Sequence, residues 1–174
     1  MFHLPPVPSW NGLHPLIIHF PIALLLIAPL FILVGAMLAP RRARAFFIAA
    51  LVLLALGTAS VFVAIETGEA AGRLAERTPE INAVLEHHQD LAEKLEFVFS
   101  AATVLFAAVF LLPILLRRAP RRLTTTLLPL VFLLLYVPAT GLLINTAHNG
   151  GRLVHEFGVH ALVPPSPLPP ANGE

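Results

Sequence analysis

The chain has no cysteine among its 174 residues, which excludes disulfides, thiolate catalysis and cysteine-ligated metal clusters. Charged residues are scarce at 12%, whereas hydrophobic residues make up 57%. The mean hydropathy of +0.82 lies well above the usual range of soluble domains. The sequence also lacks a glycine-rich phosphate loop, a nucleophile elbow and any evident internal repeat. It therefore predicts a membrane protein, and the lack of these motifs favours a binding protein over an enzyme.

Four stretches lack Asp, Glu, Lys and Arg and are long enough to cross the hydrocarbon core, which takes roughly 20 apolar residues. We expect transmembrane helices at about 15–39, 45–66, 91–116 and 123–147. An outer connection at 67–90, an amphipathic stretch at 152–163 and a proline-rich tail at 164–174 complete the chain. The predicted fold is all-α, an integral membrane four-helix bundle in a single domain, 1–163.

Two short connections, one between the first and second spans and one between the third and fourth, contain no acidic residue. Seven arginines lie in them: Arg41, Arg42, Arg44, Arg117, Arg118, Arg121 and Arg122. The positive-inside rule places both loops in the cytoplasm and both termini on the non-cytoplasmic side. In a bacterium this is the inner membrane, with both termini in the periplasm. All ten acidic residues and all eight histidines then lie on the outer side. Because topology accounts for the basic loops, the sequence gives no reason to expect nucleic-acid binding.

The arginines allow the height of each polar residue to be counted along its helix, at about 1.5 Å per residue. Four residues, one on each helix, lie 21 to 23 residues from an arginine, at about 33 Å: His19, Glu66, Glu96 and Asn145. A second layer lies 26 to 29 residues out, at about 39 to 44 Å: His14, His88 and His148. Ionisable side chains at the depth of a span are costly and tend to face the bundle interior, so this end is the predicted site.

The outer connection carries signals for helix boundaries. Gly68 and Asn149-Gly150-Gly151 predict the ends of the second and fourth helices. Thr78 followed by Pro79 predicts an N-cap and first turn of a helix that continues into the third span. Helical spacing then places His88 on the apolar stripe of that helix and His87 on its polar face.

The segment HPLIIHFP holds two of the histidines. His14 and His19 are five residues apart, about 140° around a regular helix, so they cannot face the same way on one. Pro21 removes the hydrogen bond to the carbonyl of Ile17 and predicts an irregular backbone that turns both rings toward one site. A simpler hypothesis is a structural hydrogen bond between His19 and Glu66. We expect His3, His87 and His160 to be solvated.

The segments LHPLIIHFPIALL, EHHQDLA and NGGRLVHEFGV resemble the motifs of a bacterial four-helix membrane family, the domain of unknown function 2231. The resemblance extends over most of the chain and implies the same fold and topology. His155 departs from the family motif, which often has tyrosine at that position, so the resemblance gives no essential role to it. Some relatives in this family look to be associated with c-type cytochrome domains, so the resemblance implies a redox setting and a c-type cytochrome or another periplasmic redox protein as partner.

A b-type haem is the first hypothesis for the outer site, since a helix bundle can hold haem between two imidazoles from different helices. The predicted ligands are His14 or His19, His88 and His148, and the arginines expected to meet the propionates are Arg73, Arg77 and Arg152. The second hypothesis is a transition-metal site formed by His19, Glu66 and Glu96. His87, His155, Asn145 and Arg152 are secondary candidates.

Two hypotheses involve no cofactor. His19 and Glu66 suit proton transfer, or the protein is a membrane assembly subunit whose polar end binds a periplasmic partner. Ala55 and Ala59 form a small-xxx-small pair that is consistent with close helix packing and with a homo-oligomer.

Overall fold

The computed structural model describes residues 7–159, which form five α-helices and two short helical turns and contain no strand. The elements are η1 (Trp10–Gly12), α1 (His14–Ile17), α2 (His19–Met37), α3 (Pro40–Gly72), α4 (Pro79–Leu115), η2 (Leu123–Leu127) and α5 (Leu128–His155). Four helical segments are long and apolar enough to cross a membrane: His14–Met37, Pro40–Gly72, Pro79–Leu115 and Leu123–His155. The predicted all-α fold with four transmembrane helices is confirmed. His3, His160 and the proline-rich tail at 164–174 lie outside the described residues.

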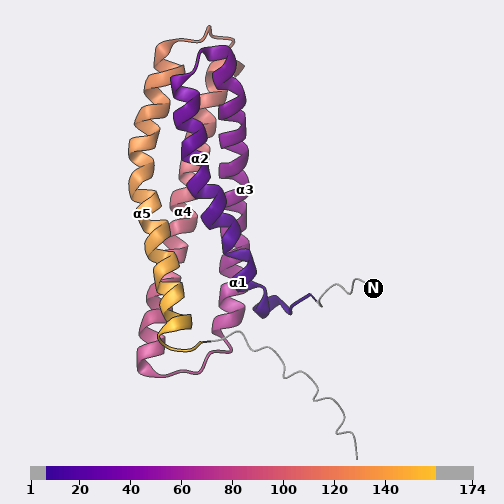
Figure 1. Cartoon of the computed structure of the whole chain (residues 1–174), viewed down its shortest axis with the longest axis vertical. Coiled ribbons are helices and arrows are strands. Elements are labelled where there is room, and N and C mark those ends of the chain that lie inside the picture. Colours follow the sequence, from indigo (N-terminus) through magenta and orange to yellow (C-terminus); the bar gives the residue numbers. More distant parts are fainter. Residues whose placement is uncertain (1–6, 160–174) are drawn as a thin grey trace, which may run out of the picture.

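The four long helices form a closed antiparallel ring (Figure 1). Helix α2 packs against α3 and α4 against α5, while α3–α4 and α2–α5 contacts join the two hairpins. Both arginine loops lie at one end of the bundle, hereafter the arginine end. The connection 73–78 and the first and last described residues lie at the opposite end (Figure 1). The two ends of the described chain therefore lie on the same side, as the prediction requires; the positive-inside rule alone assigns that side to the periplasm.

The core of the bundle is a column of aromatic side chains contributed by α3, α4 and α5. Phe47, Phe106, Phe132, Tyr136 and Phe99 follow one another at ring-centroid distances of 5.1 to 6.1 Å. All five are buried, whereas many leucines, isoleucines and valines are exposed on the outside of the bundle. Such a large apolar surface requires a hydrocarbon environment.

One polar contact in the core follows from a proline. Pro29 lies inside α2 and has no N–H, so the carbonyl oxygen of Leu25, four residues earlier, has no helical donor. The hydroxyl of Tyr136 on α5 donates to this oxygen at 2.8 Å. Both residues are buried, so Tyr136 satisfies a backbone acceptor that would otherwise have no partner within the membrane.

Two predicted helix ends are wrong. Helix α3 continues past Gly68 to Gly72, and α5 runs through Asn149, Gly150 and Gly151 to His155. Gly68 and Gly150 instead lie where a histidine ring packs closely against each helix, so glycine provides space there and does not end the helix. The predicted cap at Thr78 is confirmed, since its hydroxyl accepts from the N–H of Ile81 at 3.3 Å, and α4 then continues unbroken into the membrane.

Candidate functional site

His14 begins α1 and lies against α3 at the end of the bundle opposite the arginines. Its Nδ1 lies 2.9 Å from the carbonyl oxygen of Ala64 and 3.3 Å from the hydroxyl oxygen of Thr67. The Thr67 hydroxyl donates to the carbonyl of Val63 at 2.8 Å, so toward His14 it accepts. A carbonyl oxygen can only accept, and Nδ1 therefore carries the proton. In the neutral ring this leaves Nε2 with a free lone pair.

His88 makes the equivalent contact between α4 and α5. Its Nδ1 donates to the carbonyl oxygen of Thr146 at 3.0 Å, and the ring packs against Gly150. His88 is half-buried, whereas the adjacent His87 is exposed. The prediction that His88 faces inward and His87 faces the polar side is confirmed.

The two hairpins repeat one local arrangement. In each, the Nδ1 of a histidine donates to a backbone carbonyl, and the ring lies over the glycine four residues further along: Ala64 and Gly68 for His14, Thr146 and Gly150 for His88. The position between them, three residues after the carbonyl, holds a buried polar residue, Thr67 in one hairpin and Asn149 in the other. Although the sequence shows no evident repeat, these helix pairs use the same spacing to hold an imidazole.

The electrostatics of this end favour the neutral imidazole at His88, which precedes the uncharged stretch of α4 that begins at Phe97. Burial lowers the pKa of His88, and the positive charge that His14 carries when protonated lowers it further. A neutral ring with its Nδ1–H bonded to a carbonyl is the form in which histidine binds a metal through Nε2.

His19 and Glu66, the other residues predicted to face inward, do not. Both are exposed on the outside of the bundle, and no hydrogen bond joins them in the described part of the chain. The helix does break at Ile18, between α1 and α2, as Pro21 predicted. The break does not turn both histidines toward one site, so the predicted His19–Glu66 pair is wrong.

The remaining ligand candidates also stay apart. His148 is exposed and Glu96 is half-buried. Across residues 7–159, no three or more His, Asp or Glu side chains gather closely enough to hold a metal ion. The lower layer of His19, Glu66 and Glu96 is therefore a set of residues at similar height that forms no such group.

The secondary candidates lie around the rim of this end. His87 and His155 are exposed. Asn145 is exposed as well, and its side-chain oxygen accepts from Asn149 at 3.1 Å. Arg152 pairs with Glu156 at 2.9 Å, and its guanidinium carbon lies 6.0 Å from the centre of the Phe157 ring.

The two other arginines predicted to meet propionates lie in or beside the connection between α3 and α4. Arg73 is 3.9 Å from Glu69, and Arg77 donates to Asn82 and to the carbonyl of Gly72.

Sequence reasoning missed the buried polar partners Thr67, Thr146 and Asn149. Thr146 donates to the carbonyl of Leu142 at 2.9 Å, and Asn149 donates to that of Asn145 at the same distance. Each lies on the inward face of its helix, while the neighbouring Glu66 and His148 point outward. The available signal was a polar residue directly before a glycine, Thr67 before Gly68 and Asn149 before Gly150, at the two places where glycine predicts a helix end.

The comparisons with known proteins agree with this architecture. No curated protein and no solved structure matches the chain. Residues 11–162 match the family DUF2231, described as predicted membrane proteins, and this match includes His14, His88 and their partners on α3 and α5. The chain thus belongs to the DUF2231 family of predicted membrane proteins.

Proposed function

We propose that this protein binds a b-type haem, which His14 and His88 would hold, one from each hairpin, and that it transfers electrons at the periplasmic side of the bacterial inner membrane. The observation that carries the proposal is the repeated imidazole geometry. Each ring has its Nδ1–H bonded to a carbonyl of the paired helix, which leaves Nε2 as the free donor atom.

The number of ligands favours haem over a bare metal ion. Protein zinc sites use three or four side-chain ligands, and the described residues bring together no group of three His, Asp or Glu. A haem iron takes its four equatorial ligands from the porphyrin and requires only axial groups from the protein. Two imidazoles, one from each hairpin, match that requirement.

The surroundings also suit the group. The core of the bundle is apolar, and three arginines that can pair with propionates, Arg73, Arg77 and Arg152, lie at the end that holds the histidines. When bound, haem supplies a one-electron redox centre. The chain's own part is to fix the two imidazoles: Ala64 and Thr146 hold each tautomer through their carbonyl oxygens, and Gly68 and Gly150 let each ring approach the helix.

The test is the absorption spectrum and haem content of the detergent-purified protein, oxidised and dithionite-reduced. We expect a Soret band with resolved α and β bands after reduction. His14→Ala and His88→Ala should each remove or strongly alter these bands, because each removes one axial donor.

His19→Ala and His87→Ala are matched controls, since both residues are exposed histidines within five positions of the proposed ligands. They should leave the spectrum unchanged. A protein purified from haem-sufficient cells without a Soret band contradicts the proposal, as does a spectrum that depends on His19 but not on His14.

A further inference from the structure

A cleft of about 160 Å³ opens at the arginine end of the bundle, between α3, α4 and the start of η2. Arg44 on α3 and Arg118 after α4 line it on two sides, and Phe47, Phe110 and Pro113 form an apolar wall. Its volume is about five times the roughly 30 Å³ that one water occupies in the liquid. The cleft therefore has room for a phosphate-sized group beside Arg44, Arg118 and apolar surface.

The charge of this end is uncompensated. Seven arginines lie here without an acidic residue, three in the first turns of α3 and four between α4 and η2: Arg41, Arg42, Arg44, Arg117, Arg118, Arg121 and Arg122. None of the ion pairs found within residues 7–159 includes any of them. The backbone is also irregular here, because Arg117 has a positive φ of 50° and Leu123–Leu127 form a π-helix. Both features are uncommon and occur often at functional sites.

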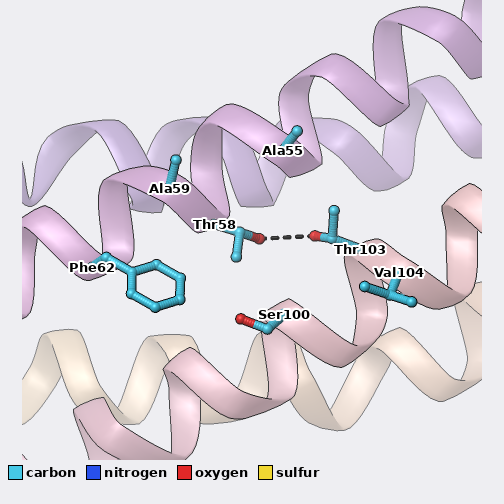
Figure 2. Close-up of a pocket in the computed structure, with 7 residues that line it drawn as sticks. All are labelled: Ala55, Thr58, Ala59, Phe62, Ser100, Thr103 and Val104. Carbon is cyan, nitrogen blue, oxygen red and sulfur yellow. Dashed lines mark hydrogen bonds between the residues drawn. The ribbon is translucent and has the colours of Figure 1, made fainter.

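A second hollow lies further along the same pair of helices. It is an open groove of about 470 Å³ between α3 and α4, and Ala55, Ala59, Phe62, Ser100 and Val104 are among its lining residues (Figure 2). Small side chains on both helices leave this space, and the hydrogen bond between Thr58 and Thr103, at 2.8 Å, joins the helices there. The lining is almost entirely apolar, as expected for a surface that contacts hydrocarbon.

The cleft and the groove lie on the same face of both helices. Arg44 and Ala55 are 11 residues apart on α3, and Thr103 and Ile114 are 11 apart on α4. Eleven residues make about three turns, so each pair shares a face, and the rise between its members is about 16 Å. A lipid tail crosses about half of the roughly 30 Å hydrocarbon core, which brings its end to the start of the groove.

We propose that one anionic phospholipid binds along this seam between α3 and α4, with its phosphate at Arg44 and Arg118 and the end of one acyl chain at the start of the groove, beside Ala55. The two guanidinium groups select the negative headgroup. The groove retains the chain, and the bound lipid joins the two helical hairpins at the end opposite the histidines. This site is independent of the proposed haem site.

Native mass spectrometry of the delipidated full chain tests the proposal with phosphatidylglycerol and phosphatidylcholine of identical acyl chains as probes. The expected result is retention of one phosphatidylglycerol in preference to phosphatidylcholine. Arg44→Gln with Arg118→Gln should weaken that binding about tenfold, which corresponds to about 1.4 kcal/mol. Arg41→Gln with Arg122→Gln removes the same charge from exposed positions outside the cleft and should change binding less than about twofold.

Ala55→Leu fills the groove without altering charge and provides the second variant. It should weaken binding of the long-chain lipid, whereas Ala101→Leu, at an exposed position of α4 outside the groove, should not. Excess glycerol 3-phosphate, which carries the phosphate without a tail, should fail to displace the lipid. Equal losses in the two arginine variants, equal retention of both lipids, or displacement by glycerol 3-phosphate would overturn the proposal.

Discussion

Gly68 and Gly150 have no side chain, and this allows the rings of His14 and His88 to pack directly against their helices. A Cβ on Gly68 would lie 2.8 Å from Cε1 of His14, and one on Gly150 would lie 3.0 Å from Cε1 of His88. Both imidazoles are also fixed through Nδ1, so neither ring can move aside without losing its hydrogen bond. A side chain at position 68 would therefore displace the His14 ring, and one at position 150 would crowd the His88 ring.

Gly68→Ala should therefore destabilise the protein by about 1–3 kcal/mol relative to the matched change Gly141→Ala, because the added methyl overpacks a fixed ring. Gly141 lies within α5 and has nothing within 4 Å of its Cβ position, so alanine there gains only helix propensity. Equilibrium unfolding in mixed detergent micelles measures the difference. Equal changes in stability for the two substitutions would show that the close contact with His14 does not affect the stability of the protein.

Counting residues along the helices predicted the height of the polar groups but not their direction. A rise of about 1.5 Å per residue tolerates an error of one residue, whereas the same error turns a side chain by about 100°. Thr67 and Asn149 face inward, and their neighbours Glu66 and His148 therefore face outward. His88 was placed correctly because a long apolar stripe with Ile81, Leu91 and Leu95 fixed the direction of that helix.

Among the elements, α2 and α5 are joined by a side-chain hydrogen bond that replaces a backbone hydrogen bond missing from α2. Pro29 leaves the carbonyl of Leu25 without a helical donor, and the Tyr136 hydroxyl occupies that place. The chain thus accommodates a proline within a transmembrane helix because another helix satisfies the freed carbonyl. The sequence alone could not predict this contact, since the two residues are 111 positions apart.

Tyr136→Phe should cost about 1–3 kcal/mol, because it leaves a buried carbonyl without a donor. In a Pro29→Ala background, the restored N–H of residue 29 can donate to Leu25, so the same tyrosine change should cost much less. A double-mutant cycle measured by unfolding in mixed micelles gives the coupling between the two positions. Additive effects of the two substitutions would contradict this account.

For the whole molecule, the four spans were predictable because each is a long stretch without charged residues. The short loops also indicated which helices pack against each other as hairpins. Within the outer connection at 67–90, the start of a helix at Pro79 was predictable from the Thr78-Pro79 pair, whereas the extension of α3 to Gly72 was not. The repeated histidine arrangement could not be predicted, because the two halves share only a spacing and almost no residue identities. That repeat places one imidazole in each hairpin. A site that uses both His14 and His88 therefore depends on how the two hairpins pack together.

The absence of cysteine allows the membrane orientation to be measured directly. Ala119→Cys lies in an arginine loop and Glu76→Cys in the connection between α3 and α4, and both residues are exposed. An impermeant maleimide added to cells with a permeabilised outer membrane should label Cys at 76, and Cys at 119 only after the inner membrane is disrupted. The reverse pattern would show that the positive-inside assignment is wrong for this protein.

The central claim is that His14 and His88 together bind one haem iron. Low-temperature electron paramagnetic resonance of the oxidised, purified protein tests this claim most directly, because it reports the axial ligands of the iron. We predict a low-spin ferric signal typical of two imidazoles, which changes to high spin in His14→Ala and in His88→Ala and persists in His19→Ala. A signal that does not depend on His14 and His88, or the absence of any haem signal, would contradict the account.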